Sequence, residues 1–202
     1  PKLHGPENIQ LDGFTDFVGA VTEGMYGAVA FDFISPHDLV KARKSWFFFD
    51  EEYVCLGTDI QSRADLPVAT TVNQALLRSD VTILQDGEVK KLPQGNRELN
   101  GVKFVHQDKV GYIFPTPATI QLSNQEEQGR WSDITDQKNI STEVVHMDVF
   151  KLWFDHGKHP DCASYQYIVV PGVTEQELQE TSGNNRGIDI IINNSDVQAV
   201  SN

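Results

Sequence analysis

The sequence predicts a mostly β protein, a large antiparallel β-sandwich with two short helices. Residues 46–49 are four consecutive aromatics, Trp-Phe-Phe-Phe, which leave no polar side chain for a solvent face. Successive side chains of a strand point to opposite faces, so such a strand must be covered on both sides, as between stacked sheets. An acidic turn at 50–52 and an apolar run at 53–56 follow. We therefore expect a hairpin here, at the centre of the sandwich.

A second hairpin gives the clearest local signal of antiparallel pairing. Asp86 and Gly87 lie between two alternating runs within residues 81–92. This dipeptide suits a two-residue type I′ turn, because both central residues of that turn take positive φ. Similar alternation recurs along the chain without any internal repeat, and we count about a dozen strands. The fold class follows from these strands.

The first third of the chain is expected to begin with turns, because residues 1–27 hold five glycines among short apolar pieces. A strand is predicted at 28–34. Ser35 then suits a helix N-cap and Pro36 the first helical position, so a short helix is predicted over 37–44 at most. A β-branched and polar alternation predicts the next strand at 68–77.

The rest of the chain alternates between strands and polar connections. Asn100 and Gly101 predict a turn, and the polar stretch 123–143 predicts an extended loop, with a short strand near Trp131. Thr174 and Glu177 form a capping-box pattern, which predicts a second short helix ending by Gly183. The remaining apolar runs are predicted strands: 102–106, 110–114, 118–122, 144–154, 165–170, 188–192 and 197–200.

Composition describes one large domain of 202 residues, with 39% hydrophobic and 22% charged residues. The net charge of −13 argues against nucleic acid or an anionic membrane as partner of the average surface. No apolar stretch is long enough to span a bilayer. Cys55 and Cys162 are too few for a disulfide framework. We expect two small buried core residues, and a single bridge is the alternative.

The residues best suited to metal chemistry gather at 155–162, where Asp155, His156, His159 and Cys162 fall within eight positions. Zinc sites recur with spacings such as H-E-x-x-H or paired C-x-x-C, and neither is present. We expect a polar, strand-ending turn and no metal. The acidic residues of the first segment, Glu7, Asp12, Asp16 and Glu23, are expected to be solvated surface, although paired carboxylates can cleave glycosides.

Several blocks of this sequence resemble polysaccharide lyase family 8. The central hairpin at 44–57 reads K-S-W-F-F-F-D-E-E-Y-V-C-L-G, like the signature of that family's central β domain. Further blocks follow in family order: 24–27, T-T-V-N-Q at 70–74, V-F-K-L-W at 149–153 with His156, Gly157, Pro160, Tyr165, Tyr167, Pro171 and Gly172, and V-Q-A-V at 197–200. The resemblance implies a supersandwich of the galactose mutarotase-like kind, most similar to the chondroitin AC lyase subgroup.

The resemblance implies that residues 1–202 are a single central β-sandwich domain of a larger bacterial lyase. A helical catalytic toroid would precede it and a small C-terminal β domain would follow, both outside this chain. The family cleaves uronic-acid polysaccharides of the chondroitin and hyaluronan type by β-elimination, with catalytic Asn, His, Tyr and Arg in the toroid. We therefore expect no catalytic residue here, and a scaffold that contacts the helical domain. A monomer, secreted or periplasmic, is also expected.

Two residues are candidates for contact with sugar. Chondroitin AC lyases carry a sugar-facing tryptophan after a Lys-Leu pair that resembles Lys2 and Leu3, and His4 takes that place here. Trp131, isolated in a polar loop, could stack on a sugar ring. No cofactor is expected, since the calcium ligands of some family members lie upstream. The alternatives to a scaffold are a stand-alone carbohydrate-binding module and an extracellular interaction domain.

Overall fold

The structure, a computed structural model, describes residues 14–35, 40–135 and 137–202. Its strands are β1 (Val18–Thr22), β2 (Gly27–Ile34), β3 (Lys41–Phe48), β4 (Tyr53–Gln61), β5 (Pro67–Leu76), β6 (Val81–Gln85), β7 (Glu88–Leu92), β8 (Gly95–Gln107), β9 (Val110–Gly129), β10 (Val145–Lys158), β11 (Ala163–Pro171), β12 (Asp189–Asn193) and β13 (Gln198–Ser201). The helices are α1 (Glu175–Thr181) and the 3-10 segments η2 (Trp131–Asp133) and η3 (Ser182–Gly187). No helix in these described ranges is long and apolar enough to cross a membrane.

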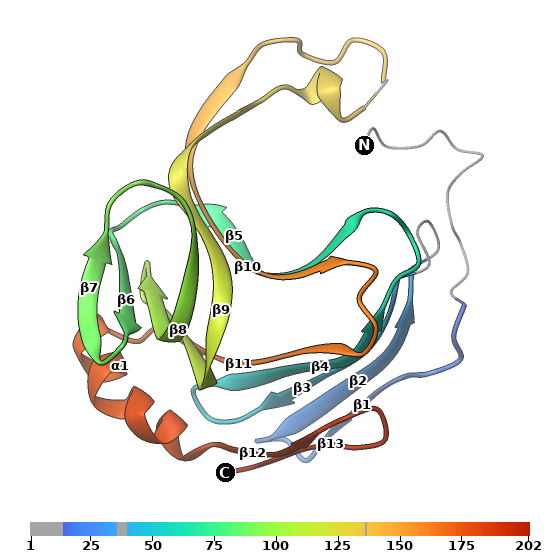
Figure 1. The fold of residues 1–202 in the computed structure, drawn as a ribbon, viewed down its shortest axis with the longest axis vertical. Coiled ribbons are helices and arrows are strands. Elements are labelled where there is room, and N and C mark those ends of the chain that lie inside the picture. Colours follow the sequence, from blue (N-terminus) through green and yellow to red (C-terminus); the bar gives the residue numbers. More distant parts are fainter. Residues whose placement is uncertain (1–13, 36–39, 136) are drawn as a thin grey trace.

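Eleven strands form one antiparallel sheet that divides into two layers, as Figure 1 shows. The main layer has the order β1-β2-β3-β4-β11-β9-β8-β6-β7. The second layer forms where β10 pairs with both β9 and β5. The long strand β9 belongs to both layers, because residues 110–113 pair with β11 and residues 121–129 pair with β10. The expected antiparallel sandwich is therefore confirmed, with its two layers joined through β9 and through β8, whose residues 95–99 pair with residues 120–124 of β9.

The central hairpin lies where the sequence places it. Trp46 in β3 faces Cys55 in β4 across the ladder, and β4 pairs on its other side with β11. Strand β4 is buried on both faces: Cys55 is 2% exposed, and its neighbours Val54 and Leu56 are 0% exposed. The cover predicted for both faces of the aromatic run is only partly right, because Trp46, Phe47 and Phe49 are half-buried and it is the neighbouring β4 that is fully covered on both sides. Phe48, at the end of β3, is 41% exposed.

Two hydrophobic cores lie on opposite faces of the main layer. The first fills the space between the layers, with Cys55, Tyr112, Phe114, Leu122, Phe150, Leu152, Phe154, Tyr165 and Tyr167 among its members. The second lies on the other face, where Leu178 of α1 and Ile188 cover Val54 and Leu56. The hairpin β12–β13 contributes Ile190 and Val200 to the same core. The chain after β11 therefore serves as the outer cover of the main layer.

Two local predictions are confirmed at the level of backbone geometry. Asp86 and Gly87 have φ of 53° and 81°, as a type I′ turn between β6 and β7 requires. Thr174 caps α1 with a complete capping box, since its side chain accepts from Glu177 and the Glu177 side chain accepts from the Thr174 backbone. Both motifs act through neighbouring residues, which explains why sequence alone finds them.

The helix predicted over 37–44 is wrong for its last four residues, because β3 begins at Lys41 and pairs with β2. Residues 36–39, with the predicted first helical turn, lie outside the described residues. The sequence alternates through this part of β3, where Ala42 is buried and Trp46 packs on the same core. Period-two burial between two neighbouring strands overrides the local helix signal of Ser35 and Pro36.

Two predicted interruptions of strands are also wrong. Asn100 and Gly101 form no turn, because they lie inside β8 at a register shift where Gly101 takes φ of 72°, as in a β-bulge. The break predicted between the strands at 110–114 and 118–122 is absent, since β9 continues through Pro115 and Pro117 to Gly129. They lie between the residues that pair with β11 and those that pair with β10, where a missing N–H costs least.

The cysteine prediction is half right. Cys55 is buried in the first core and Cys162 is exposed, and both are free thiols. Cys162 lies in the bend between β10 and β11, where it takes φ of 68° and is exposed. Burial raises the pKa of the Cys55 thiol to about 11.

Candidate functional site

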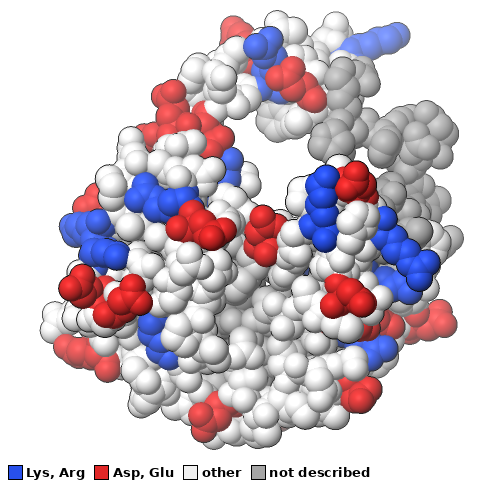
Figure 2. Space-filling model, viewed as in Figure 1, with Lys and Arg blue, Asp and Glu red and all other residues white. Residues whose placement is uncertain are grey.

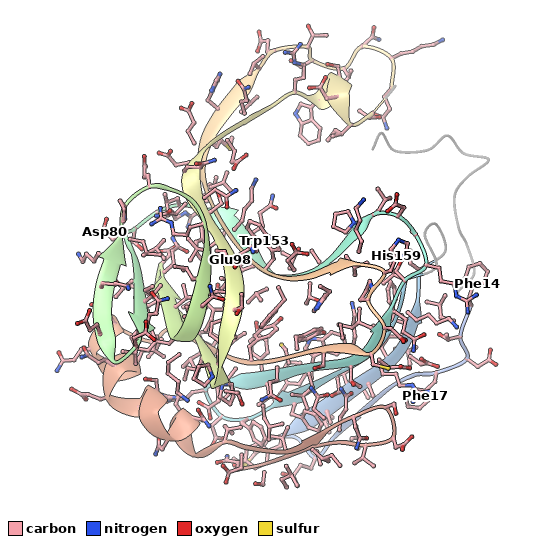
Figure 3. All side chains as sticks on the ribbon, in the orientation of Figure 1. Phe14, Phe17, Asp80, Glu98, Trp153 and His159 are labelled. Carbon is pink, nitrogen blue, oxygen red and sulfur yellow. The ribbon has the colours of Figure 1, made fainter. Side chains whose placement is uncertain are left out.

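A polar face covers the outside of the second layer. Phe150, Leu152 and Phe154 of β10 point into the first core, so the intervening residues Lys151 and Trp153 point outward. Their cross-strand partners share this face: Thr71, Gln74, Gln121 and, one strand further, Glu98. Figure 3 labels Trp153 and Glu98. We call these residues, with Glu127, the outer polar face.

Four polar side chains of this face form two pairs. Gln121 donates from Nε2 to Glu98 Oε2 at 2.7 Å. Lys151 Nζ lies 3.0 Å from Glu127 Oε1, and this hydrogen bond holds the pKa of the Glu127 carboxyl below its usual range. Amides and an indole on a flat sheet can contact sugar hydroxyls and C–H faces. The alternation around Trp153 is the signal in the sequence that marks this face.

A two-stranded arm extends beyond the outer polar face. From Val145 to Asp148, β10 pairs only with residues 126–129 of β9, and this ribbon projects from the body in Figure 1. The arm exposes a group of apolar side chains: Trp131 (57%), Met147 (50%), Ile134 (44%), Val144 (42%) and Val145 (41%). We call this group the arm patch. An exposed apolar group of this kind commonly marks a contact surface.

The two predicted sugar contacts differ in what the structure shows. His4 lies outside the described residues. Trp131 opens η2 near the tip of the arm, as part of the arm patch and not of the outer polar face. The stretch 123–143 is therefore only partly a loop, since its first seven residues belong to β9 and Trp131 is helical instead of extended.

The residues of metal-ligand type at 155–162 do not converge, because their side chains lie on two different sides of the chain. His156 Nε2 shares a hydrogen bond of 2.8 Å with Thr70 Oγ1, toward the interior. His159 and the adjoining Lys158 both reach the Asp65 carboxylate, at 3.5 and 3.1 Å. No group of three His, Cys, Asp or Glu that could hold a metal occurs among the described residues. Asp16 and Glu23 are exposed, and Glu7 and Asp12 lie outside the described ranges.

The tyrosines of the chain are held in their neutral form. Burial raises the pKa of four of them: Tyr53, Tyr112, Tyr165 and Tyr167. The nearby Asp50 carboxylate raises the pKa of the fifth, Tyr26. A general base works best when its pKa lies near the working pH, so these shifts run opposite to what a tyrosine base needs. Burial also lowers the pKa of His156, which keeps that ring neutral at pH 7.

Comparison with known proteins identifies the domain. The sequence model of the polysaccharide lyase family 8 super-sandwich domain matches residues 3–182. The chain is 38% identical to chondroitinase-AC of Pedobacter heparinus over 93% of this chain and 26% of that protein. It is 33% identical to xanthan lyase of Bacillus sp. over 88% of this chain and 20% of that protein.

The solved structures agree with this assignment. A structure of chondroitinase AC lyase from enzyme–oligosaccharide complexes superposes with a TM-score of 0.81 at 36% identity, over 92% of this chain and 27% of that one. The chain thus spans between a fifth and a little over a quarter of the length of these relatives. The residues matched by the family model include the whole first core and α1, while Ile188 of the second core lies beyond them. This chain belongs to polysaccharide lyase family 8.

Proposed function

We propose that this chain is the central β-sandwich domain of a polysaccharide lyase that cleaves uronic-acid glycans of the chondroitin or hyaluronan type by β-elimination. In this role it is a scaffold and one wall of the substrate cleft, and by itself it is inactive. The observation that carries the proposal is the family match over residues 3–182, which coincides with the two-layered sandwich. The share of the relatives that the chain spans leaves room for a separate catalytic domain.

The chemistry of β-elimination supports this division of labour. One group must remove the proton beside the carboxylate, another must protonate the leaving oxygen, and fixed donors must stabilise the enolate-like transition state. The tyrosines here have raised pKa values, and the Lys151 ammonium is paired with Glu127. These steps are therefore assigned to a helical domain outside this chain. Any calcium ligands would lie there too, and the sandwich itself uses no cofactor.

The surface of the sandwich suits contact with that domain better than capture of substrate. The net charge of −13 repels a polyanionic glycan, and Figure 2 shows acidic side chains interspersed with basic ones over the viewed face. The arm patch supplies exposed apolar contacts that a neighbouring domain would cover. Because a polysaccharide is too large to enter a cell, the parent enzyme is proposed to be a secreted or periplasmic monomer.

The test follows heat of binding and the ultraviolet absorbance of unsaturated uronate together. The isolated chain is mixed with chondroitin, hyaluronan and xanthan at low ionic strength, and we expect neither signal. The full-length enzyme, assayed in parallel, is expected to generate absorbance with a uronic-acid glycan. Absorbance from the isolated chain would contradict the scaffold role. A full-length enzyme inactive on all three glycans would contradict the proposed substrate class.

The exposure of Trp131 favours a second candidate, a carbohydrate-binding module. An indole that is 57% exposed can stack on a sugar ring. Heat of binding without absorbance, abolished in Trp131→Ala but kept in Ile134→Ala, would support this candidate. Ile134 is a matched control because it belongs to the same patch and is 44% exposed but has no ring to stack.

A further inference from the structure

Lys44, within the signature of the central hairpin, carries a charge on the inner face of the sandwich. It lies on β3 between Ala42 and Trp46, which both contribute to the first core. Its Nζ is 4.6 Å from the centroid of the Phe33 ring on β2. This contact fixes the direction of the side chain, since Phe33 packs on the same core. The ammonium therefore points into the space between the layers.

Lys44 lines a pocket of about 300 Å³ at one end of the sandwich. Its walls come from four strands and include Phe33, Ala42, Ile60, Val68 and Thr70. Lys44 is the single charged side chain among its described lining residues. The Thr70 hydroxyl is engaged with His156. The pocket thus combines mostly apolar walls with one cation.

Among the described residues, Lys44 has no carboxylate as counter-ion. Three other lysines form ion pairs with carboxylates: Lys91 with Asp80, Lys151 with Glu127 and Lys158 with Asp65. In the described parts of the chain, no carboxylate lies within ion-pair distance of Lys44, although acidic residues outnumber basic ones by 29 to 16. Burial lowers the pKa of Lys44, because the desolvated ammonium is disfavoured. The face of Phe33 offsets part of this cost.

We propose that this pocket binds a small carboxylate ligand the size of one uronic acid residue. The ligand carboxylate is the missing counter-ion of Lys44, and Phe33 and Val68 contact the apolar face of the sugar ring. A volume of about 300 Å³ lies at the lower end of ligand pockets, which suits a single ring and not a polymer. The pocket itself stands on Lys44 and its described walls, and the choice of a uronic acid as its ligand rests on the proposed substrate class.

The first test is protection of Lys44 from chemical labelling. The chain is pulsed with an amine-acylating reagent, with and without glucuronate, and modification of each lysine is read by mass spectrometry. We expect glucuronate to slow modification of Lys44 at least tenfold and its neutral methyl ester to have little effect. Lys41, exposed on the same strand, is the internal control and should be unaffected. Equal protection by acid and ester would overturn the proposal.

The second test measures affinity by calorimetry with glucuronate, acetate and inorganic phosphate. Lys44→Met keeps the apolar stem and removes the charge, and Lys41→Met is its matched control. Loss of a charge-assisted contact should weaken glucuronate binding by about tenfold to a hundredfold in Lys44→Met only. Unchanged affinity in Lys44→Met would refute the site. Phosphate binding more tightly than glucuronate would refute its carboxylate specificity. If that variant does not fold, the labelling experiment on the unaltered chain still decides.

Discussion

At the scale of single residues, Gly57 shows how closely the first core is packed. A Cβ atom built on Gly57 in β4 would lie 2.1 Å from Cε1 of the Tyr165 ring on β11. The Tyr165 ring cannot retreat easily, because it stacks on Phe154 with ring centroids 6.0 Å apart. His156 lies against both rings, with centroids 6.5 Å from each. The glycine is therefore required by a close approach of an aromatic ring and not by its backbone angles.

Gly57→Ala is accordingly expected to destabilise the chain by about 1–3 kcal/mol, the usual cost of overpacking a core. The free energy of unfolding in urea measures this effect. Gly129→Ala is the control, since a Cβ there meets nothing within 4 Å, and its effect should stay within about 0.5 kcal/mol. Equal urea midpoints for the two variants would contradict this expectation, because they would show that the Tyr165 ring moves aside at little cost in free energy.

At the scale of elements, α1 depends on its cap. A helix of seven residues is too short to be stable alone, and Leu178 is its buried residue in the second core. Thr174→Ala removes one half of the capping box and should cost about 1 kcal/mol at pH 7. Thermal unfolding of this variant beside the unaltered chain gives the measurement. No loss of stability would mean that burial of Leu178 alone holds the helix.

The same cap predicts a dependence on pH. Hydrogen bonds from the backbone and hydroxyl of Thr174 hold the pKa of the Glu177 carboxyl below its ordinary value. A lowered carboxyl pKa stabilises the folded state above the ordinary glutamate pKa, and this stabilisation is lost as the pH falls through the lowered value. The stability gap between the chain and Thr174→Ala should therefore narrow on acidification. In a Glu177→Gln background, the gap should be independent of pH across that range.

Elements were predictable where a short stretch decides its own structure. Asp86 and Gly87 determine a hairpin, Thr174 and Glu177 determine a helix start, and the aromatics at 46–49 with the acidic turn after them mark the central hairpin. Predictions of secondary structure failed where pairing with another strand determines the conformation. Lys41 is extended because β2 and β4 lie on either side of it. For the candidate site, the sequence singled out Trp131, whose contact with sugar stays a prediction. It did not predict the outer polar face, which forms only once four strands are in register.

At the scale of the whole molecule, Arg186 joins the outer cover to the central hairpin. Its Nε lies 2.9 Å from Glu52, whose side chain is 8% exposed, and its Nη2 lies 2.8 Å from Glu51, which is 73% exposed. Arg186→Met leaves the Glu52 carboxylate buried without a partner, and should cost about 3–5 kcal/mol. Glu51→Gln should cost less than about 1 kcal/mol, because exposed pairs contribute little. Equal losses of unfolding free energy in the two variants, measured in urea, would contradict this role of Arg186.

The arm should be dispensable for folding but not for assembly. Neither core includes a described residue between Leu122 and Phe150. Replacing 130–144 by Asn-Gly, so that a tight turn joins the paired Gly129 and Val145, should leave the free energy of unfolding within about 0.5 kcal/mol. In the full-length enzyme, the same change should lower lyase activity by loosening the contact through the arm patch. Full lyase activity of this variant would contradict a role of the arm in the contact between the domains.

The pairing of β4 with β11 has a consequence for synthesis of the chain. Val54 and Ile168 are partners in the ladder although on the order of a hundred residues separate them. At about 5–20 residues per second, a ribosome needs roughly 5–20 s to produce the residues between them. During that interval the aromatic hairpin emerges without the strand that completes its sheet. The rate of translation between β4 and β11 therefore determines how long the unpaired aromatic hairpin can contact other nascent chains.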